Sequence, residues 1–489
     1  MDWLSEHGFL IALMVGYTVL LLRNASEGNK ASADVRGYVV GGRVLGGVAL
    51  GFSYFATFAS TNSYVGHAGQ SYASGLPWLT LAVLIVLFTW VSWKFVAPRL
   101  YAFVSSQDAL TLPDFLALRF PHPAGREYLR VLSGIVIVLA SVLYLVAIFK
   151  GAGNVFQEFL DISYTLAVGI TLLIVVFYTT LGGFVSVVRT DVIQGVFMVI
   201  GAALIFGFVT DAAGGITRLP ELKESPDTAP LFEFGAIVPA AVIIGMSLSG
   251  ALKLLVDPRQ LSRFYGLRSA GEIRTGIWVA VIGIALIQFC LFPVGVYAHF
   301  LLDGVTDTDR IVPTLINDPA IFPGPVADFL VVALISAAMS SMDSVLLVAA
   351  SVLQRDVVQV VRPKMPAVRF TRIAVVGFAV VSAGLALNPP GGIVEMTLFS
   401  GSVYAVCFFP AVLLGLWWNR GSWFAVIASM VSGMAVLLLW MLVGWGAVLH
   451  ELFPSLAVSL LVYVMLSLNS PADPRIGGRV ATNESTPLM

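Results

Sequence analysis

Apolar runs long enough to cross a lipid bilayer follow one another along almost the whole chain. A helix of roughly 20 apolar residues spans the hydrocarbon core, and short polar segments separate the runs. The pattern predicts an all-α polytopic membrane protein with about 13 transmembrane helices. The predicted spans are 8–22, 45–75, 77–97, 130–157, 163–184, 190–210, 233–256, 275–301, 326–352, 370–388, 394–416, 422–443 and 447–468.

The polar segments between the spans predict the orientation of the helices. Cytoplasmic loops of membrane proteins carry an excess of lysine and arginine. With the N-terminus outside, all but five of the 27 basic residues fall in segments that this topology places inside. The exceptions are Arg218, Lys223 and Arg310 in outside loops and Lys150 and Lys253 within helices. We expect an integral protein of the plasma or inner membrane, with its N-terminus outside and its C-terminus in the cytoplasm.

The composition agrees with a protein that lies mostly in lipid. The 489 residues are 58% hydrophobic and 11% charged, whereas a soluble domain has about 25% charged residues. The net charge of −1 gives no reason to expect nucleic acid as a partner. Cys290 and Cys407 lie in apolar runs, which argues against a disulfide framework. The sequence contains no metal-ligand cluster, phosphate-binding loop or nucleophile motif, so we expect neither an enzyme nor an organic cofactor.

The stretch FASTNSYVGHAGQSYASG (58–75) is unusually polar for the middle of a span. Irregular backbone survives at bilayer depth only inside protein or beside a cavity. Small residues and hydroxyls also occur where two membrane helices pack closely, but Asn62, His67 and Gln70 are larger than such packing needs. A discontinuous helix whose freed carbonyls face a midplane site explains the stretch better. The candidate solute-binding side chains here are Thr61, Ser63, His67 and Gln70.

A second broken helix is expected because transporters of this kind are often built from two inverted repeats. Five spans run from 45 to 210, and five more run from 233 to 416. The first span of the second set contains GMSLSGALK (245–253), which has Ser247 and Ser249 in mid-span. We expect the second interruption here, with both serines beside the solute.

The segment ALISAAMSSMDSVLLVAASVLQRD (333–356) carries small and hydroxylated residues at helical spacing. Ala337, Ser340, Ser341 and Ser344 share one face of a helix. A hard cation prefers oxygen ligands, and two hydroxyls with the carbonyls of a nearby unwound helix could replace the water shell of sodium. A packing face of small residues is the alternative interpretation.

Two acidic residues near the ends or middle of spans also point to ion binding, because charge inside a bilayer is costly. Asp343, three residues after Ser340, is expected to support the cation site or to pair elsewhere. Asp191 stands beside Arg189 at the inner end of its helix, where a surface ion pair is the simpler interpretation.

Two lysines, Lys150 and Lys253, lie in predicted spans and are not counted with the basic residues of the inside segments. Inside those spans, Lys150 and Lys253 have no acidic residue three or four positions away. They pair across helices or hold a substrate carboxylate, and the second interpretation predicts an anionic solute. The sequence also leaves the role of His67 open. Its side chain either hydrogen-bonds the solute, changes its protonation state during transport, or is a buried neutral histidine that a neighbouring group satisfies.

Several of these motifs together resemble the sodium:solute symporter family, which includes carriers of proline, pantothenate, sugars, sialate and monocarboxylates. The resemblance runs from about residue 38 to residue 425. Its motifs are YVVGGR (38–43), ATFASTNSYVGHAGQSYASGLPW (56–78), YTTLGGFVSVVRTDVIQG (178–195), AAMSSMDS (337–344) and FFPAVLLGLWWNRGSWFA (408–425).

The resemblance implies a leucine-transporter-like core of five plus five helices, with one extra helix before it and two after it. The expected divisions are an N-terminal helix and inside loop (1–36), a transport core (37–420) with repeats at about 43–210 and 233–416, two C-terminal helices (421–468) and a disordered cytoplasmic tail (469–489).

The resemblance also implies a sodium site. Its ligands would be carbonyls of Ala59 and Asn62 in the first broken helix together with Ala337, Ser340 and Ser341. The acid of the family's TD..Q motif matches Asp191, which makes this residue a contributor to ion coupling. Some relatives have an acid where Thr61 stands here, and this departure implies a different solute.

We therefore expect a secondary active transporter that takes up a small organic solute, such as a carboxylate, together with sodium by alternating access. The expected partners are the solute, sodium as coupling ion and the lipid bilayer, and the functional unit is a monomer. A proton-coupled carrier of the same fold is the nearest alternative, and a channel or a transport-fold sensor is a more distant one.

Overall fold

The structure is a computed structural model that describes residues 8–31 and 34–473. No β-strand occurs within these ranges, and the predicted tail lies outside them from residue 474 onward. The α-helices are α2 Gly8–Ala31, α3 Val35–Val40, α4 Gly47–Phe58, α5 His67–Ser74, α6 Leu79–Val91, α7 Ala97–Gln107, α8 Leu112–Arg119, α9 Tyr128–Leu160, α10 Tyr164–Ala212, α11 Ala240–Leu252, α12 Pro258–Tyr265, α13 Glu272–Tyr297, α14 Ile311–Ile316, α15 Gly324–Val352, α16 Gln359–Val361, α17 Ala367–Ala386, α18 Ile393–Phe409, α19 Gly415–Trp417, α20 Trp423–Val443 and α21 Leu452–Ser467.

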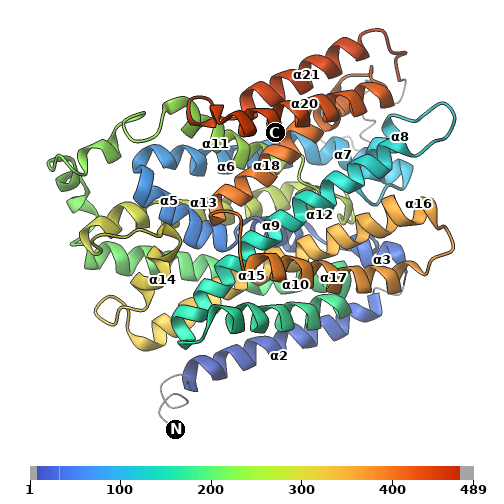
Figure 1. Ribbon diagram of the computed structural model, residues 1–489. Helices are drawn as coiled ribbons and strands as arrows, with labels where there is room; N and C mark the ends of the chain where they lie inside the picture. Colours follow the sequence, from blue (N-terminus) through green and yellow to red (C-terminus); the bar gives the residue numbers. More distant parts are fainter. Residues whose placement is uncertain (1–7, 32–33, 474–489) are drawn as a thin grey trace.

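The all-α membrane architecture is confirmed. Ten helical segments of the described chain are long and apolar enough to cross a membrane, and three shorter apolar helices accompany them. Every predicted span contains one of these helices, although the number of crossings itself stays a prediction. The helices lie roughly side by side, so that α5 and α14 stand at one end of the bundle and α3, α8 and α16 at the other (Figure 1).

One long helix combines two of the predicted spans. α10 continues from Tyr164 to Ala212 but bends at Gly183, where φ is 63° and ψ is −172°. Only glycine adopts this conformation without a steric penalty. The sharp bend separates the two halves at the polar motif between the spans predicted at 163–184 and 190–210.

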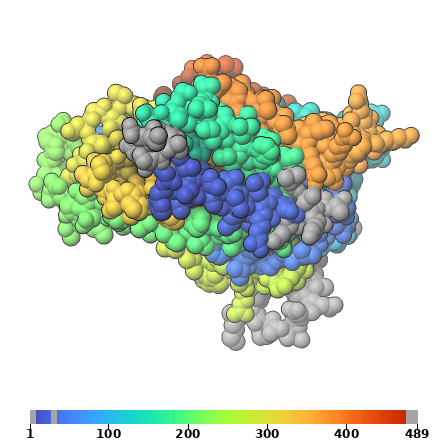
Figure 2. All heavy atoms as spheres, turned by 90° about the horizontal axis from the view of Figure 1, so that it is seen from below, coloured from blue at the N-terminus to red at the C-terminus, as the bar shows by residue number. Residues whose placement is uncertain are grey.

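The centre of the bundle is α15. Its apolar window is wholly buried, and α4, α9, α10 and α17 pack around it. The additional N-terminal helix α2 instead lies along the surface against α10 (Figure 2), where Val15 and Val19 are exposed as expected of residues that face lipid. At the other end of the sequence, α20 and α21 pack on each other and on α18.

The first broken helix occurs where the polar stretch predicted it. α4 ends at Phe58, and Ala59 has an extended backbone with φ −73° and ψ 104°. The chain resumes as one widened turn over Asn62–Gly66 and continues into α5. The interruption is therefore only Ala59 and Ser60, and most of the polar stretch is helical.

The second broken helix exists, but its predicted position was wrong. Ser247 and Ser249 lie inside the regular helix α11, which ends at Leu252. The break comes at Val256 and Asp257, immediately before α12. Asp257 caps α12 by accepting a hydrogen bond from the Arg259 backbone N–H, and a proline at the first helical position disfavours helical backbone in the residue before it.

The polar backbone groups released by the second break are satisfied by other helices. The carbonyl of Leu254 accepts hydrogen bonds from Tyr54 Oη at 3.0 Å and from Ser92 Oγ at 2.8 Å. Leu45, just before α4, exchanges backbone hydrogen bonds with the segment that follows α12. These contacts tie the two broken helices to each other.

Close packing of α13 on α5, the second part of the first broken helix, depends on Gly295. A Cβ atom at this position would lie 1.8 Å from the carbonyl oxygen of Ala68 and 2.6 Å from the backbone nitrogen of Tyr72. Backbone atoms of a packed helix have little freedom to move away. Gly295 therefore sets how closely α5 approaches α13.

We predict that Gly295→Ala destabilises the protein by about 2 kcal/mol or more, because overpacking against backbone forces the helices apart. Gly377→Ala is the matched control, since no atom lies within 4 Å of its Cβ position in α17. The control should be neutral or stabilising by up to about 1 kcal/mol. Thermal unfolding of both purified variants in one detergent measures the difference, and equal stability of the two would refute the assigned role of Gly295.

Candidate functional site

The end of α4 meets the serine face of α15. Ser340 Oγ donates a hydrogen bond of 2.8 Å to the carbonyl of Ala56, and Ser341 Oγ donates one of 3.0 Å to the carbonyl of Thr57. The last carbonyls of a helix have no partner within the helix, so the two hydroxyls satisfy groups that the break leaves open. Both serines are fully buried.

This meeting point has the electrostatic character of a cation site. The C-terminal end of a helix carries partial negative charge, and α4 ends here among buried residues rather than in water. Hydroxyl and carbonyl oxygens are the ligands that hard cations prefer. The arrangement suits a small monovalent ion such as sodium.

The structure brings together only some of the residues that were predicted to bind sodium. Ser340 and Ser341 face the first break as predicted, and the carbonyl of Ala337 accepts a longer bond of 3.3 Å from Ser340. The carbonyls that receive the serine hydroxyls are one turn earlier than Ala59 and Asn62. Asn62 instead donates through Nδ2 to His67 Nε2 at 3.1 Å. Coordination by Ala59 and Asn62 stays a prediction.

Asp191 belongs to a buried network rather than to a surface ion pair. Its Oδ2 lies 3.2 Å from Arg263 Nη2 and accepts a hydrogen bond of 2.5 Å from Ser53 Oγ. Arg263 also donates to the hydroxyls of Thr57 at 2.5 Å and Ser344 at 2.6 Å. The guanidinium group thus joins α4, α10, α12 and α15 next to the serine face.

Asp343 lies on the α10 side of α15. Its carboxylate accepts a hydrogen bond of 3.3 Å from Tyr178 Oη, and its side chain is fully buried. Asp343 and Asp191 are two buried acids near one buried base, Arg263. In charged form the three groups carry one net negative charge, which is the charge that a bound sodium ion would neutralise.

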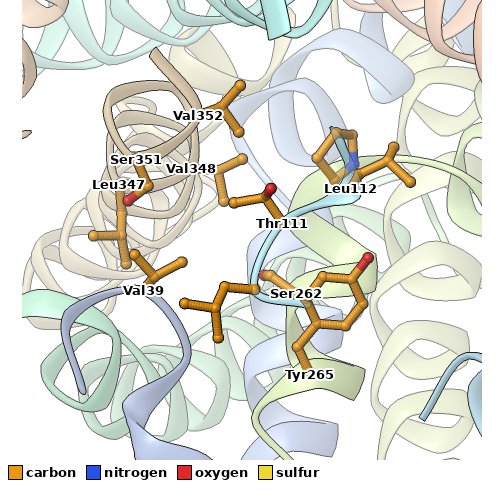
Figure 3. Close-up of a pocket in the computed structure, with 11 residues that line it drawn as sticks. Val39, Thr111, Leu112, Ser262, Tyr265, Leu347, Val348, Ser351 and Val352 are labelled. Carbon is orange, nitrogen blue, oxygen red and sulfur yellow. The ribbon is translucent and has the colours of Figure 1, made fainter. Parts of the chain in front are cut away.

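A small cavity continues along α15 toward the end of the bundle where α3 and α8 stand (Figure 1). It lies between α12 and α15, with Ser262, Tyr265, Ser351 and Thr111 among its lining residues (Figure 3). Ser351 is seven residues after Ser344 and therefore lies on the same face of the helix. The cavity offers space on that side of the Arg263 network.

The predicted solute residues separate into two groups. Thr61 and His67 are buried between helices, and among the described residues Thr61 Oγ1, His67 Nδ1 and Ser247 Oγ have no hydrogen-bond partner. His67 also stacks on Phe292 at a ring-centroid distance of 4.7 Å. These unpartnered atoms are available to a ligand.

The other predicted residues have partners within the protein. Ser249 Oγ donates to the carbonyl of Leu398 and contacts Ser402 Oγ, which fastens α11 to α18. Gln70 donates to Ser74 near the outer end of α5, and Ser63 Oγ accepts a long bond of 3.4 Å from Gln288. Direct solute contacts by Ser63, Gln70 and Ser249 stay predictions, and the structure gives these side chains packing roles.

The two lysines within helices have different environments. Lys150 Nζ pairs with Asp309 Oδ2 at 2.7 Å, which is the cross-helix alternative left open by the sequence. Asp309 also accepts a hydrogen bond from the Ile393 backbone N–H at the start of α18. Lys253 is buried beside the second break, and within the described ranges it makes no ion pair. A role of Lys150 in solute binding stays a prediction.

Two buried arginines were missed in the sequence. The predicted span ended at residue 256, so Arg259 and Arg263 were counted among the basic residues of an inside loop. The structure buries both in α12. The dipeptide Asp257-Pro258 is a helix-start signal, and it could have shown that the chain re-enters a helix there.

Comparison with known proteins identifies a family whose members share this fold. A model of the sodium:solute symporter family matches residues 38–433. The osmoregulated proline transporter OpuE of Bacillus subtilis is 27% identical and aligns over 94% of this chain and 93% of its own. The sodium/pantothenate symporter of Haemophilus influenzae is 25% identical over 88% of this chain and 89% of its own. A solved Na+-coupled sialic acid symporter, 19% identical, superposes with a TM-score of 0.76 over 95% of this chain and 99% of its own.

We predict that Arg263→Gln destabilises the protein by about 3–5 kcal/mol, because it leaves the Asp191 carboxylate buried without its charge partner. The double variant Arg263→Gln with Asp191→Asn should recover a large part of that loss. The exposed pair Arg218–Glu221 provides the control, and Glu221→Gln should cost less than about 1 kcal/mol. A double-mutant cycle of thermal unfolding tests the network, and strictly additive effects of the two substitutions would contradict it.

Proposed function

Because the chain belongs to the sodium:solute symporter family, we propose that its coupling ion is bound where the end of α4 meets Ser340 and Ser341 of α15. The protein is a membrane-embedded sodium-coupled symporter of a small solute, and it is a transporter rather than an enzyme. The observation that carries the ion site is the pair of hydroxyls aimed at the open carbonyls of a helix that ends inside the bilayer.

The solute is proposed to lie between the two broken helices. Support comes from buried polar atoms that have no partner among the described residues and that cluster around the first break and the helices facing it. These atoms are Thr61 Oγ1, Asn62 Oδ1, His67 Nδ1, Trp78 Nε1, Ser247 Oγ and Gln288 Oε1. Leaving such atoms unsatisfied costs roughly 1–3 kcal/mol each, and a polar solute would supply their missing hydrogen bonds.

A carboxylate-bearing solute is the class that fits this proposal. The relatives are named for proline and pantothenate, and the structural neighbour is named for sialic acid. All three compounds contain a carboxyl group. The replacement of an acid by Thr61 at the first break also removes a negative charge that would repel such a solute.

The proposal also covers the orientation in the membrane and the oligomeric state. We place the N-terminus outside and the C-terminus in the cytoplasm of a plasma or inner membrane, and we take the monomer as the functional unit. The distribution of basic residues supports this orientation.

We predict that Ser340→Ala raises the sodium concentration for half-maximal uptake by about tenfold or more, because a buried oxygen ligand of a charged group is lost. Asn62→Ala should change it by less than about threefold, because the backbone carbonyl remains. Ser432→Ala in the peripheral helix α20 is the control and should behave like the unchanged protein.

Uptake into proteoliposomes, with choline replacing sodium, measures this dependence. Uptake that continues unchanged in choline would show that sodium is not the coupling ion, and a proton gradient would then be the alternative. Equal sodium dependence of Ser340→Ala and the control would remove Ser340 from the site while leaving sodium coupling intact.

The orientation is tested with single cysteines that react with a membrane-impermeant maleimide. In a variant lacking Cys290, we predict that Lys223→Cys is labelled from outside intact cells, whereas Lys364→Cys reacts only after permeabilisation. Both side chains are exposed, so access depends on the side of the membrane. The reverse labelling pattern would invert the proposed topology.

A further inference from the structure

We propose that the second break holds the carboxylate group of the transported solute, through Lys253 and Arg259 on either part of the broken helix and next to the ring of Tyr144. This inference rests on the proposed solute site and names the chemistry of its charged end. The position is set by the helix breaks, since Lys253 follows α11 directly and Arg259 is the second residue of α12.

Lys253 is a buried cation that reaches across to the first break. Its Nζ lies 5.1 Å from the ring centroid of Phe58, the last residue of α4, and 5.7 Å from that of Tyr144 in α9. The residue is 5% exposed. Within the described part of the chain, no carboxylate lies within ion-pairing distance of Nζ. The ammonium group therefore stands between the two breaks with aromatic faces as its neighbours.

Asp257 does not neutralise Lys253, because Arg259 occupies its carboxylate. Arg259 Nε lies 3.0 Å from both Asp257 oxygens, and Nη2 lies 2.5 Å from Oδ2. The remaining nitrogen, Nη1, is buried and has no hydrogen-bond partner among the described residues. The guanidinium carbon is 3.9 Å from the Tyr144 ring centroid. Within the described chain, Arg259 thus leaves both N–H groups of Nη1 without a partner, next to the ring that Lys253 also approaches.

The charges of Lys253, Arg259 and Asp257 do not balance. Two cations and one carboxylate leave one net positive charge at bilayer depth, where unpaired charge is costly. Contacts with aromatic faces offset only part of that cost. A carboxylate carries one negative charge and two acceptor oxygens, so it can pair with Lys253 Nζ and accept from Arg259 Nη1 at once.

The neighbouring helix α18 leaves room for the lysine stem. A Cβ at Gly401 would lie 3.3 Å from Lys253 Cδ and 2.8 Å from the carbonyl oxygen of Ser249. The glycine therefore allows the aliphatic part of Lys253 to lie close to α18 while Nζ extends toward Phe58. This packing orients the ammonium group toward the space between the breaks.

Ligand-induced thermal stabilisation of the purified full-length protein in sodium tests the proposal. The probes are propionate and pantothenate, each paired with a neutral counterpart, propionamide and panthenol. We expect at least one acid to stabilise the protein and its neutral counterpart to have no effect. Lys253→Met should raise the Kd of that acid by at least about thirtyfold, because a buried charge partner is lost.

Three further variants assign the effect. Lys253→Arg keeps the charge and should retain acid binding within about tenfold. Arg259→Lys removes the Nη1 donor and should weaken the acid while keeping its preference over the neutral compound. Lys94→Met removes an exposed lysine and should leave the Kd unchanged.

The inference is overturned if no acid stabilises the protein, if a neutral counterpart binds as well as its acid, or if Lys253→Met binds the acid normally. The acid-versus-neutral comparison uses the unchanged protein, so it decides the question even when Lys253→Met does not fold. Stabilisation by sodium alone is measured in the same experiment. If sodium stabilises the unchanged protein but neither acid is preferred over its neutral counterpart, this inference is refuted and the proposed sodium site stands. If sodium alone does not stabilise the unchanged protein, the result counts against the proposed sodium site.

Discussion

A helix that ends inside a bilayer leaves carbonyl oxygens that neither water nor its own backbone can satisfy, and the structure depends on how this protein satisfies them. At the first break the hydroxyls of Ser340 and Ser341 take up the carbonyls of α4. At the second, Tyr54 and Ser92 donate to the carbonyl of Leu254. A serine hydroxyl both donates to a carbonyl and offers its own oxygen to a cation. The first break brings two such hydroxyls, from neighbouring residues of one helix, to two successive carbonyls, so that one sodium ion could share these oxygens. The second break has a single carbonyl with both donors directed at it.

The buried charges also differ between the two breaks. The cluster beside α15 has two acids, Asp191 and Asp343, for the single base Arg263, whereas the cluster at the second break has two bases for the single acid Asp257. With each group in its charged form, the clusters carry opposite net charges. An isolated cation or anion would correct one of them and leave the other exposed to the low dielectric of the bilayer. Joint binding of sodium and the proposed carboxylate would correct both, which would give a physical reason for their joint transport.

Sequence reasoning located those parts of the site that depend on local pattern. The polarity of residues 58–75 predicted the first break, and helical spacing put Ser340 and Ser341 on one face. The second break was misplaced, because the prediction rested on the small residues near Ser247 and not on the Asp-Pro pair at which α12 begins. The partners of Arg263 and of Lys150 could not be found in this way. Lys150 and Asp309 are 159 positions apart, and a single sequence carries no signal for a pair formed only by packing.

Alternating access requires some of these contacts to break in turn. At the end of the bundle where α5 and α14 stand, Asp309 holds both Lys150 and the start of α18, and the Thr308 backbone packs directly against Gly69 of α5. Toward the other end, Arg263 fastens α12 to α4, α10 and α15 next to the cavity that follows α15. Movement of α12 would separate the Arg263 guanidinium group from its buried hydrogen-bond partners. A ligand shifts such an equilibrium only by its differential affinity for the two states. A sodium ion at the proposed site beside Ser340 and Ser341 would supply that difference, because its positive charge offsets that of the Asp191 carboxylate as Arg263 moves away.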